Sequence, residues 1–274
     1  MALVLITGAT DGIGLETARQ LLAQDHTVLL HGRHQARAEA CRESLAKTLP
    51  ASHILAVWGD LSLMREVVLL AKQVAALAPR LDALINNAGV YAPTRALTED
   101  GFEQTMAVNH FAHFLLTRLL IANLERAAQA RIVTVSSGTH HSGRLALEDL
   151  TGSVGWTPYG AYSTSKLANL LFTRALAKRV ARTNMTANAL HPGVIGTKLL
   201  SAGFGTGGAS VTQGARTSVF LATAPEVTGV SGRYFVDCRE TAVARIAQDE
   251  RVAEGLWAES ERLLKAFLPL DSRP

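Results

Sequence analysis

The sequence has few cysteines and no long apolar run. Only two of its 274 residues are cysteine, Cys41 and Cys238, and neither lies in a spacing typical of a metal site. Two cysteines cannot build a disulfide framework, so we expect both to be reduced, small, buried side chains. No stretch approaches the roughly 18 uncharged apolar residues that cross a bilayer. These absences argue against a disulfide-rich secreted scaffold and against a membrane-spanning helix.

The sequence also lacks long runs of residues with the same charge. The formal net charge is +4, charged residues make up 18%, and lysine and arginine do not form a long run. Proteins that bind nucleic acids usually gather basic residues in a stripe or patch, so we expect no nucleic-acid partner. No basic leader precedes Leu3, and we expect a soluble, cytoplasmic protein with no membrane partner.

A glycine-rich turn opens the chain. The apolar run Leu3–Ile6 is typical of a strand buried on both faces, and Gly8, Gly12 and Gly14 follow it. Glycine permits close approaches, so backbone N–H groups and a helix N-terminus can converge on an anion such as a pyrophosphate. The spacing differs from the common Gly-x-Gly-x-x-Gly fingerprint, and by itself it also fits a plain strand-to-helix turn.

Short apolar runs alternate with helical patterns after this turn. The predicted strands are Leu3–Ile6, Thr27–Leu30, His53–Val57, Leu81–Ile85, Arg131–Val135, Met185–Leu190 and Gly232–Val236. The predicted helices begin near Ile13 and cover Gln35–Leu49, Leu63–Leu77, Phe102–Ala128, Ala161–Ala181, Thr212–Ala222 and Ala253–Phe267. This alternation predicts an α/β fold with a parallel sheet covered on both faces. Without a composition shift, we expect one domain over residues 1–274.

The end of the second predicted strand bears on the choice of cofactor. His31, Gly32, Arg33 and His34 stand where such folds face the adenosine ribose of a dinucleotide. An acidic residue that would bind the ribose 2′-hydroxyl is missing, whereas Arg33 can pair with a 2′-phosphate. We therefore expect NADP rather than NAD. Arg37 can add charge or face solvent, and the two histidines are interpreted as polar fillers.

Polar residues also follow the third and fourth predicted strands. Asp60 and Leu61 can contact an adenine, and Asp60 can equally cap the next helix. Asn86–Gly89 ends the fourth strand, where an amide can fix a turn and small residues leave room for a ligand. We expect a structural role for Asn86 and cofactor contact from 87 to 89.

Two side chains on one predicted helix have acid–base potential. Tyr162 and Lys166 are four residues apart, so they lie on the same helix face. A nearby ammonium favours the phenolate and lowers the pKa of a tyrosine toward working pH, which suits general acid–base catalysis. Taken alone, however, this spacing is common on helices.

Together, these motifs resemble the short-chain dehydrogenase/reductase family over nearly the whole chain. The match rests on Thr7-Gly8-x-x-x-Gly12-x-Gly14, Asp60, Asn86-Asn87-Ala88-Gly89, Asn109, Ser137, Tyr162-x-x-x-Lys166 and Pro192-Gly193 with Thr197. The resemblance implies a doubly wound Rossmann fold with seven parallel strands in the order 3-2-1-4-5-6-7. Within the family, the chain looks most like the retinol-dehydrogenase-like branch, whose members mostly use NADP.

The resemblance also implies roles for particular residues. Tyr162 would be the general acid or base, Lys166 would lower its pKa and hold the nicotinamide ribose, and Ser137 would orient the substrate oxygen. Asn109 would hold a water that relays protons to Lys166, and it can also be a helix-kink amide. The implied cofactor contacts are Gly8, Thr10, Asp11, Gly12, Ile13, Gly14, Arg33, Asp60, Leu61, Asn87, Ala88, Gly89, Tyr162, Lys166, Pro192, Gly193 and Thr197.

We expect the substrate pocket at the carboxyl ends of the strands. Its predicted walls are Val90–Ala92, the loop Gly138–Tyr159, and the glycine-rich Leu199–Gly208 within a lid of about residues 195–212. That last run could equally be a plain surface loop. The wall candidates are mixed, and the apolar ones are Tyr91, Trp156, Leu199, Leu200 and Phe204. From these we expect an uncharged, apolar aldehyde or ketone and its alcohol. The adjacent His140 and His141 point apart and predict no metal site.

Two alternatives concern assembly and catalysis. The predicted helices Phe102–Ala128 and Ala161–Ala181 have apolar positions on more than one face. Family members often pair these helices across a two-fold axis, which suggests a homodimer; otherwise the C-terminal segment covers them. Ser137, Tyr162 and Lys166 favour an oxidoreductase over a non-catalytic dinucleotide-binding sensor or scaffold.

Overall fold

A computed structural model describes residues 1–205 and 207–268 of the chain. The predicted lid of about residues 195–212 contains residue 206, and the predicted domain extends over 269–274. Those positions lie outside the described residues.

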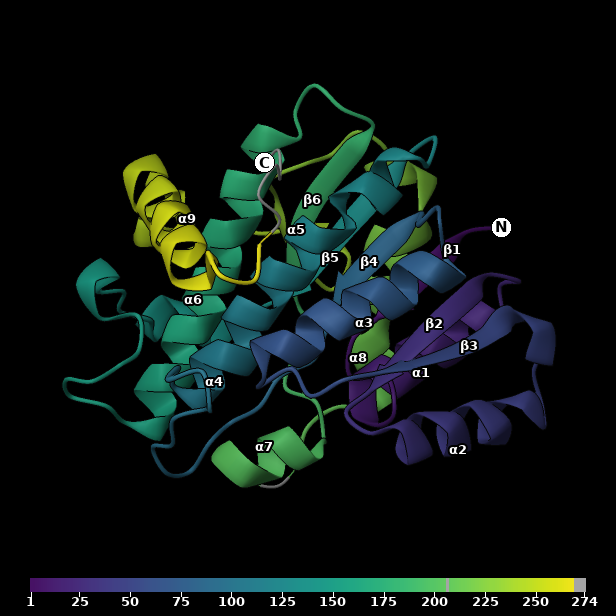
Figure 1. Cartoon of the computed structure of the whole chain (residues 1–274), viewed down its shortest axis with the longest axis horizontal. Coiled ribbons are helices and arrows are strands. Elements are labelled where there is room, and N and C mark those ends of the chain that lie inside the picture. Colours follow the sequence, from purple (N-terminus) through teal and green to yellow (C-terminus); the bar gives the residue numbers. More distant parts are fainter. Residues whose placement is uncertain (206, 269–274) are drawn as a thin grey trace.

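The described strands form a single eight-stranded sheet (Figure 1). They are β1 (Leu3–Ile6), β2 (Thr27–Gly32), β3 (Ile54–Trp58), β4 (Ala83–Asn86), β5 (Ala130–Val135), β6 (Met185–His191), β7 (Tyr234–Val236) and β8 (Arg239–Glu240). Their order is β3-β2-β1-β4-β5-β6-β7-β8, and every pair is parallel except β7 with β8. The predicted seven-strand parallel order is confirmed, and the short antiparallel β8 is an addition at the edge.

Helices cover both faces of this sheet, because its strands are apolar on both sides. The helices are α1 (Gly12–Leu22), α2 (Gln35–Ala46), α3 (Met64–Leu77), α4 (Gln104–Met106), α5 (Ala112–Glu125), α6 (Pro158–Arg179), α7 (Lys198–Gly203), α8 (Val211–Thr223) and α9 (Glu250–Leu264). Leu5 of β1 packs in a core with α3, α5, α6 and α9, whereas Val4 and Ile6 pack with α1, α2 and α8. Strand side chains alternate in this way between the two faces.

Several predicted helix ends differ from the structure. The helix predicted over Phe102–Ala128 is divided into α4, a π-helical turn at Ala107–Phe111, and α5. Helix α6 begins earlier than predicted, at Pro158, because the hydroxyl of Thr157 accepts the N–H of Gly160 as a cap. Helix α2 ends at Ala46 instead of Leu49, and α9 covers 250–264 instead of 253–267. The sequence prediction did not include α7.

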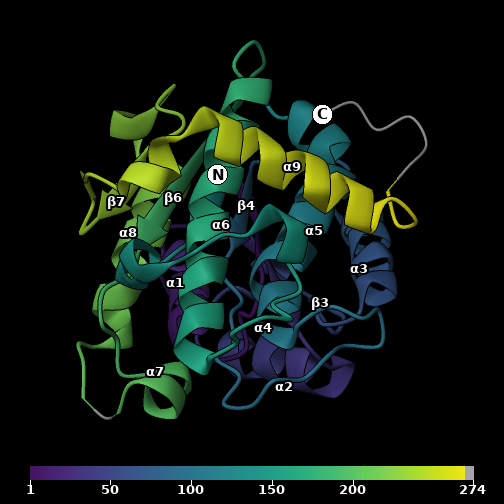
Figure 2. The ribbon, with the colours of Figure 1, turned by 90° about the vertical axis from the view of Figure 1, so that its left-hand side faces the viewer.

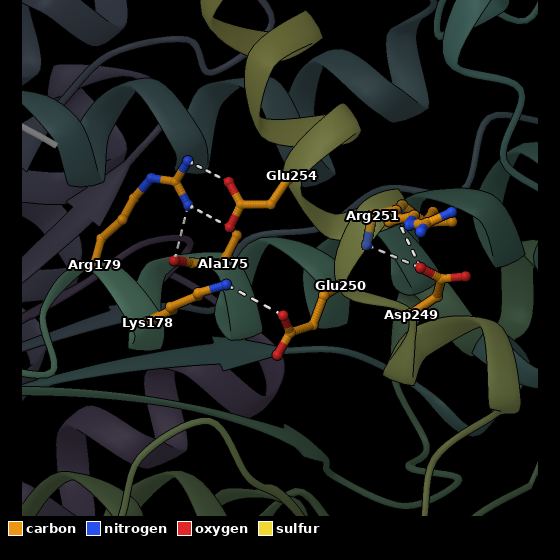
Figure 3. A network of polar contacts seen from close by, with 8 residues as sticks. Ala175, Lys178, Arg179, Asp249, Glu250, Arg251 and Glu254 are labelled. Atoms are coloured by element: carbon orange, nitrogen blue, oxygen red, sulfur yellow. Dashed lines mark hydrogen bonds and ion pairs between the residues drawn. The ribbon is translucent and has the colours of Figure 1, made fainter.

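The C-terminal helix α9 lies across α6 and α5 (Figure 2). Trp257 of α9 is buried against Phe114 and Phe172, at ring-centroid distances of 4.8 and 5.9 Å. Ion pairs border this apolar contact: Arg179 of α6 binds both carboxylate oxygens of Glu254, at 3.1 and 2.7 Å (Figure 3). The apolar faces of α5 and α6 are thus covered by the C-terminal segment.

The parallel topology brings the polar strand ends together. The carboxyl ends of β1, β2, β4, β5 and β6 meet at one edge of the sheet, where the chain order reverses between β1 and β4. Among the residues described, no helix combines the length and apolar character needed to cross a membrane.

Candidate active site

The glycine-rich turn after β1 is built for close backbone approach. Gly8 has a φ of +65°, a conformation that side chains rarely adopt. A Cβ on Gly14 would lie 2.3 Å from the carbonyl oxygen of Gly8, so only glycine lets α1 start here. His31 holds the turn: its Nδ1 accepts the N–H of Gly8 at 3.1 Å, and its Nε2 donates to the carbonyl of Gly59 at 2.9 Å. The buried imidazole is a structural filler, as predicted.

A cavity of about 1000 Å³ extends from this turn to Tyr162. Every residue predicted to contact the cofactor lines it, and so does Ser137. Ligand pockets of this kind measure roughly 300–1,000 Å³, so the space suits a dinucleotide together with a small substrate. The glycine cradle and the cavity therefore fit a dinucleotide, with the helix N-terminus of α1 available to a pyrophosphate.

Basic side chains gather in the part of the cavity beside the carboxyl end of β2. Arg33 lies beside Asp60, with its Nε 3.8 Å from Oδ2, and its side chain is 53% exposed. Asp60 also accepts the N–H of Ser62 at 2.8 Å, within the loop before α3. The predicted capping role is wrong, because Leu63 stands at the N-cap of α3 and the N–H of Met64 donates to Asp100. Arg37 and Lys198 both pair with the carboxylate of Asp11, at 3.2 and 2.6 Å.

Asn86, the last residue of β4, and Asn87, which follows it, have different partners. Asn86 is fully buried and its amide donates to the hydroxyl of Thr117 at 3.0 Å, which agrees with the predicted structural role. The amide of Asn87 donates to the carbonyl of Thr7 at 2.8 Å and also borders the cavity. Asn87 thus joins the β4 turn to the glycine-rich turn.

Tyr162 and Lys166 face the same cavity from α6. The Nζ of Lys166 lies 5.4 Å from the centre of the Tyr162 ring and donates to the carbonyl of Val135 at 3.1 Å. Burial lowers the pKa of Lys166 to about 8. Burial also raises the pKa of Tyr162 to about 12, an effect that its hydrogen bond with Ser137 partly offsets. The phenol is therefore a neutral proton donor. The expectation that Lys166 lowers the pKa of Tyr162 is not met in this structure, because burial of the phenol dominates.

The two serines after β5 play separate parts. Ser136 is buried and its hydroxyl donates to the carbonyl of Lys166 at 2.7 Å, so it ties β5 to α6. Ser137 lines the cavity, and its Oγ accepts the N–H of Thr139 at 3.2 Å. Because the remaining hydrogen-bonding capacity of Ser137 faces Tyr162, it is the serine placed to meet a substrate oxygen.

Asn109 lies behind the cavity wall, in the π-helical turn. Its Oδ1 accepts the N–H of Val90 at 2.8 Å, and its Nδ2 donates to the carbonyl of Val90 and to the hydroxyl of Ser165, at 3.1 and 3.0 Å. The side-chain amide is thus engaged with protein groups and fixes the segment after Gly89. The predicted water relay through Asn109 stays a prediction.

Comparison with known proteins agrees with this geometry. Residues 2–204 match the family model of the short chain dehydrogenases. Retinol dehydrogenase 14 of Homo sapiens is 41% identical over 287 residues, which cover 94% of this chain and 84% of that protein. Retinol dehydrogenase 12 of Bos taurus is 39% identical over 270 residues, covering 95% and 85%.

A solved structure of an uncharacterized protein from Mycobacterium paratuberculosis superposes with a TM-score of 0.80. It is 35% identical and covers 98% of this chain and 96% of that one. This chain belongs to the short-chain dehydrogenase family. It is an oxidoreductase that resembles the retinol dehydrogenases and acts on CH–OH groups, as the sequence predicted at this level.

Aromatic rings surround the reactive phenol of this short-chain dehydrogenase. Tyr91 and Phe204 lie 5.7 and 5.6 Å from the Tyr162 ring, and 5.3 Å from each other. Gly203 of α7 sits against Tyr91, because a Cβ there would come within 2.7 Å of the ring. Phe204, Leu199 and Leu200 line the cavity. The other two predicted walls contribute less, because Val90–Ala92 reaches the cavity through Val90 and the loop Gly138–Tyr159 through Thr139.

Sequence reasoning missed some residues of this dehydrogenase site. His191 lines the cavity at the end of β6, and burial lowers its pKa. His113 is buried behind the glycine-rich turn. His191 stands directly before the predicted Pro192-Gly193 pair, so its place at a strand end was a usable signal. No local signal marks His113. Among the residues described, no cluster of three His, Cys, Asp or Glu side chains suits a metal ion.

Proposed function

We propose that this dehydrogenase uses NADP(H) to interconvert an apolar aldehyde or ketone and its alcohol. The observation that carries the proposal is the continuity of one cavity, which joins the glycine-rich turn at Gly8 to Ser137 and Tyr162. A dinucleotide anchored at the glycine-rich turn would extend along this cavity toward Tyr162. Its hydride-bearing ring would then meet a carbonyl substrate beside the phenol. NADPH supplies the hydride when it is bound.

The chain's own residues would handle the proton. In reduction, the hydroxyl of Tyr162 gives its proton to the carbonyl oxygen while the carbonyl carbon gains the hydride, and the product is the neutral alcohol. The hydroxyl of Ser137 orients that oxygen. The ammonium of Lys166, 5.4 Å from the phenol ring, favours the phenolate that remains. In oxidation, the same phenolate takes the proton back.

The guanidinium groups that follow β2 favour NADP over NAD. Arg33 and Arg37 both line the cavity with guanidinium groups that are half-exposed. A guanidinium matches a phosphate in a bidentate pair, whereas a ribose hydroxyl gains little from it. This pairing supports selection of the 2′-phosphate.

An apolar substrate is favoured by the aromatic and aliphatic wall. Phe204, Leu199 and Leu200 line the cavity together with Tyr162, and Tyr91 packs against the rings of Tyr162 and Phe204. Apolar surface removed from water contributes roughly 25 cal/mol per Å² to binding, while a charged group would lose its hydration there. We therefore propose uncharged aldehydes and ketones over anionic ones.

A substrate panel tests these proposals together. NADPH absorbance is followed with the purified chain, a series of apolar and anionic aldehydes and ketones, and either NADPH or NADH. We expect turnover of apolar carbonyls with a clear preference for NADPH. Turnover confined to anionic substrates, or a preference for NADH, would contradict the respective part of the proposal.

The Tyr162→Phe variant separates an enzyme from a sensor. It keeps the ring and removes the proton donor, so we expect turnover to disappear while NADPH still binds. The control is Tyr159→Phe. Tyr159 also lies in α6, its side chain is exposed, and its hydroxyl donates to the hydroxyl of Ser142 in the preceding loop. No turnover in the wild type despite NADPH binding would favour the dinucleotide-binding sensor. Equal loss in both variants would show that the Tyr162 hydroxyl has no special role in turnover.

We also propose a homodimer and a cytoplasmic location. The faces of α5 and α6 on which a homodimer was predicted carry α9 in this chain. A homodimer would therefore need another surface or a displaced α9, and light scattering at micromolar concentration decides between dimer and monomer. Cys41 and Cys238 are both free thiols, which supports the proposed cytoplasmic location.

A further inference from the structure

A buried histidine joins the glycine-rich turn to the catalytic helix. His113 lies in the first turn of α5 and is 1% exposed, between Thr7 after β1 and Asn109 in the π-helical turn. Its Nε2 is 3.0 Å from the hydroxyl oxygen of Thr7, and its Nδ1 is 3.1 Å from the carbonyl oxygen of Asn109. Thr7 and Asn109 are both fully buried. One imidazole thus bridges the two halves of the site.

The partners of His113 determine which nitrogen carries its proton. The carbonyl of Asn109 can only accept a hydrogen bond, so Nδ1 must carry the hydrogen. The hydroxyl oxygen of Thr7 already accepts the N–H groups of Asn87 and Ala88, at 2.9 and 3.0 Å. The hydroxyl proton of Thr7 is then free to bond Nε2, which is 3.0 Å away, in preference to the carbonyl of Ile85 at 3.4 Å.

A protonated imidazole would break this arrangement. Its Nε2–H would point at the Thr7 oxygen, whose two lone pairs are already used by N–H donors. Burial independently lowers the pKa of His113 to about 3. The network is complete only with a neutral ring that carries its hydrogen on Nδ1.

The bridge continues from Asn109 to the reactive tyrosine. The amide of Asn109 donates to the hydroxyl of Ser165, and this hydroxyl donates to the carbonyl of Tyr162 at 2.7 Å. The same amide holds both backbone groups of Val90 at the cavity wall. Hydrogen bonds therefore run without interruption from Thr7 through His113, Asn109 and Ser165 to the backbone of Tyr162.

We propose that His113 is a positioning residue, which keeps Asn109 and the Tyr162 helix in register with the dinucleotide-binding turn. The proposal rests on the proposed function for its kinetic consequence but not for its structural one. A displacement of about 1 Å between reacting groups is enough to cost on the order of a hundred-fold in rate. Replacing His113 removes the acceptor nearest to the Thr7 hydroxyl proton and a donor to the carbonyl of Asn109, and the loss of a hydrogen-bond partner inside the protein is costly.

The first test needs no cofactor or substrate. Nitrogen NMR of the cofactor-free chain labelled at histidine reports the hydrogen on each ring nitrogen, and the His113 signals are assigned by their loss in His113→Leu or, failing that, His113→Asn. We expect a neutral ring with its hydrogen on Nδ1 at pH 7. A hydrogen on Nε2 alone, or a charged ring, would overturn the proposal.

The second test is kinetic, with a matched histidine as its control. His110 is equally buried, also has its pKa lowered to about 3, and bonds the hydroxyl of Ser260 in α9, away from the cavity. We expect His113→Leu to lower kcat roughly ten-fold or more with the best carbonyl of the panel. Its Kd for NADPH should change less than about three-fold, because Asn87 and Ala88 still hold Thr7. His110→Leu should keep its kcat.

The conservative variant completes the comparison. In His113→Asn the side-chain amide can still donate to the carbonyl of Asn109, while the bond to Thr7 stays broken, so we expect it to recover part of the lost kcat. Equal kcat in His113→Leu and His110→Leu, or no recovery in His113→Asn, would overturn the positioning role while leaving the proposed function intact. Absence of turnover in the wild type would instead refute the proposed function, and the NMR measurement alone would then decide the role of His113.

Discussion

Lys166 and Tyr162 are buried together on one face of α6, with the ammonium 5.4 Å from the ring centre. The pKa of Lys166 is about 8 there, below its usual 10.5, because burial disfavours the charge. The buried ammonium therefore lowers the stability of the fold, and such a cost is common at catalytic sites, which agrees with the proposed role of Lys166.

The Lys166→Met variant should separate these two effects. Methionine removes the buried charge, and the carbonyl of Val135 keeps its second donor, the amide of Asn169, at 3.1 Å. We expect the free energy of unfolding of the cofactor-free protein at pH 7 to rise by about 1–3 kcal/mol, and kcat to fall at least roughly a hundred-fold. Urea unfolding measures the free energy of unfolding, and NADPH absorbance measures kcat.

The pH dependence of that gain follows from the lowered pKa of Lys166. As pH rises from about 8, the folded wild type releases the lysine proton while the unfolded chain keeps it up to about 10.5. The wild type gains stability over this interval, so the advantage of Lys166→Met should shrink. A variant less stable than the wild type at pH 7 would refute this account.

Three buried histidines should make the protein sensitive to acid. Burial lowers the pKa of His31 to about 4, and those of His110 and His113 to about 3. The unfolded chain binds these protons below about pH 6.5 and the folded chain does not, so stability is lost as pH falls through that value. Three sites give a loss of roughly 3–4 kcal/mol per pH unit between pH 6 and 5. Urea midpoints at pH 7, 6 and 5 measure it, and equal midpoints would contradict the expectation.

The arginine after β2 should decide between NADPH and NADH. Replacing Arg33 with alanine removes a cation that faces the cavity, so we expect the KM for NADPH to rise about ten-fold or more with little change for NADH. Steady-state kinetics with both cofactors measures this. Parallel changes for the two cofactors would mean that Arg33 does not bind a 2′-phosphate.

Removing the charge of Asp11 should have the opposite effect on the KM for NADPH. It pairs with both Arg37 and Lys198, and its Oδ1 also accepts the N–H of Gly12 as the cap of α1. The Asp11→Asn variant keeps an oxygen for the cap and releases both cations, so we expect a lower KM for NADPH. An unchanged or higher KM would show that these cations do not reach the bound cofactor.

The packing of α9 should be essential to the fold. Trp257 is 2% exposed, contacts Phe114 and Phe172, and has the guanidinium of Arg179 4.0 Å above its ring. We expect Trp257→Ala to lower the free energy of unfolding by roughly 3–5 kcal/mol. The control Leu69→Ala truncates a side chain that is 54% exposed and should cost little. Similar thermal midpoints for the two variants would contradict this role of α9.

The site residues on strand ends could be predicted because their signals are local. Gly8, Asn87, Ser137 and Pro192 each follow a short apolar run, and parallel strands necessarily bring such ends to one edge of the sheet. The Tyr162 and Lys166 pair needs only helical spacing. The strand order followed from the resemblance and is confirmed by the register of the pairs.

Features that depend on distant contacts could not be predicted in the same way. His113 meets Thr7 across 106 residues, and its neighbours in sequence read as an ordinary apolar helix. The π-helical turn is set by the contacts of Asn109 with Val90 and Ser165 rather than by propensity. The position of α9 likewise depends on Trp257 finding α5 and α6, which periodicity does not specify.

The most direct test of the central claim follows the hydride into the product. Samples of NADPH carrying deuterium on either face of the reactive nicotinamide carbon are incubated with the wild type and an apolar aldehyde, and the alcohol is examined by mass spectrometry. The account predicts deuterium on the carbinol carbon from one of the two labels, and no labelled alcohol from Tyr162→Phe. An alcohol without deuterium from either label, or equal labelling by Tyr162→Phe, would contradict it.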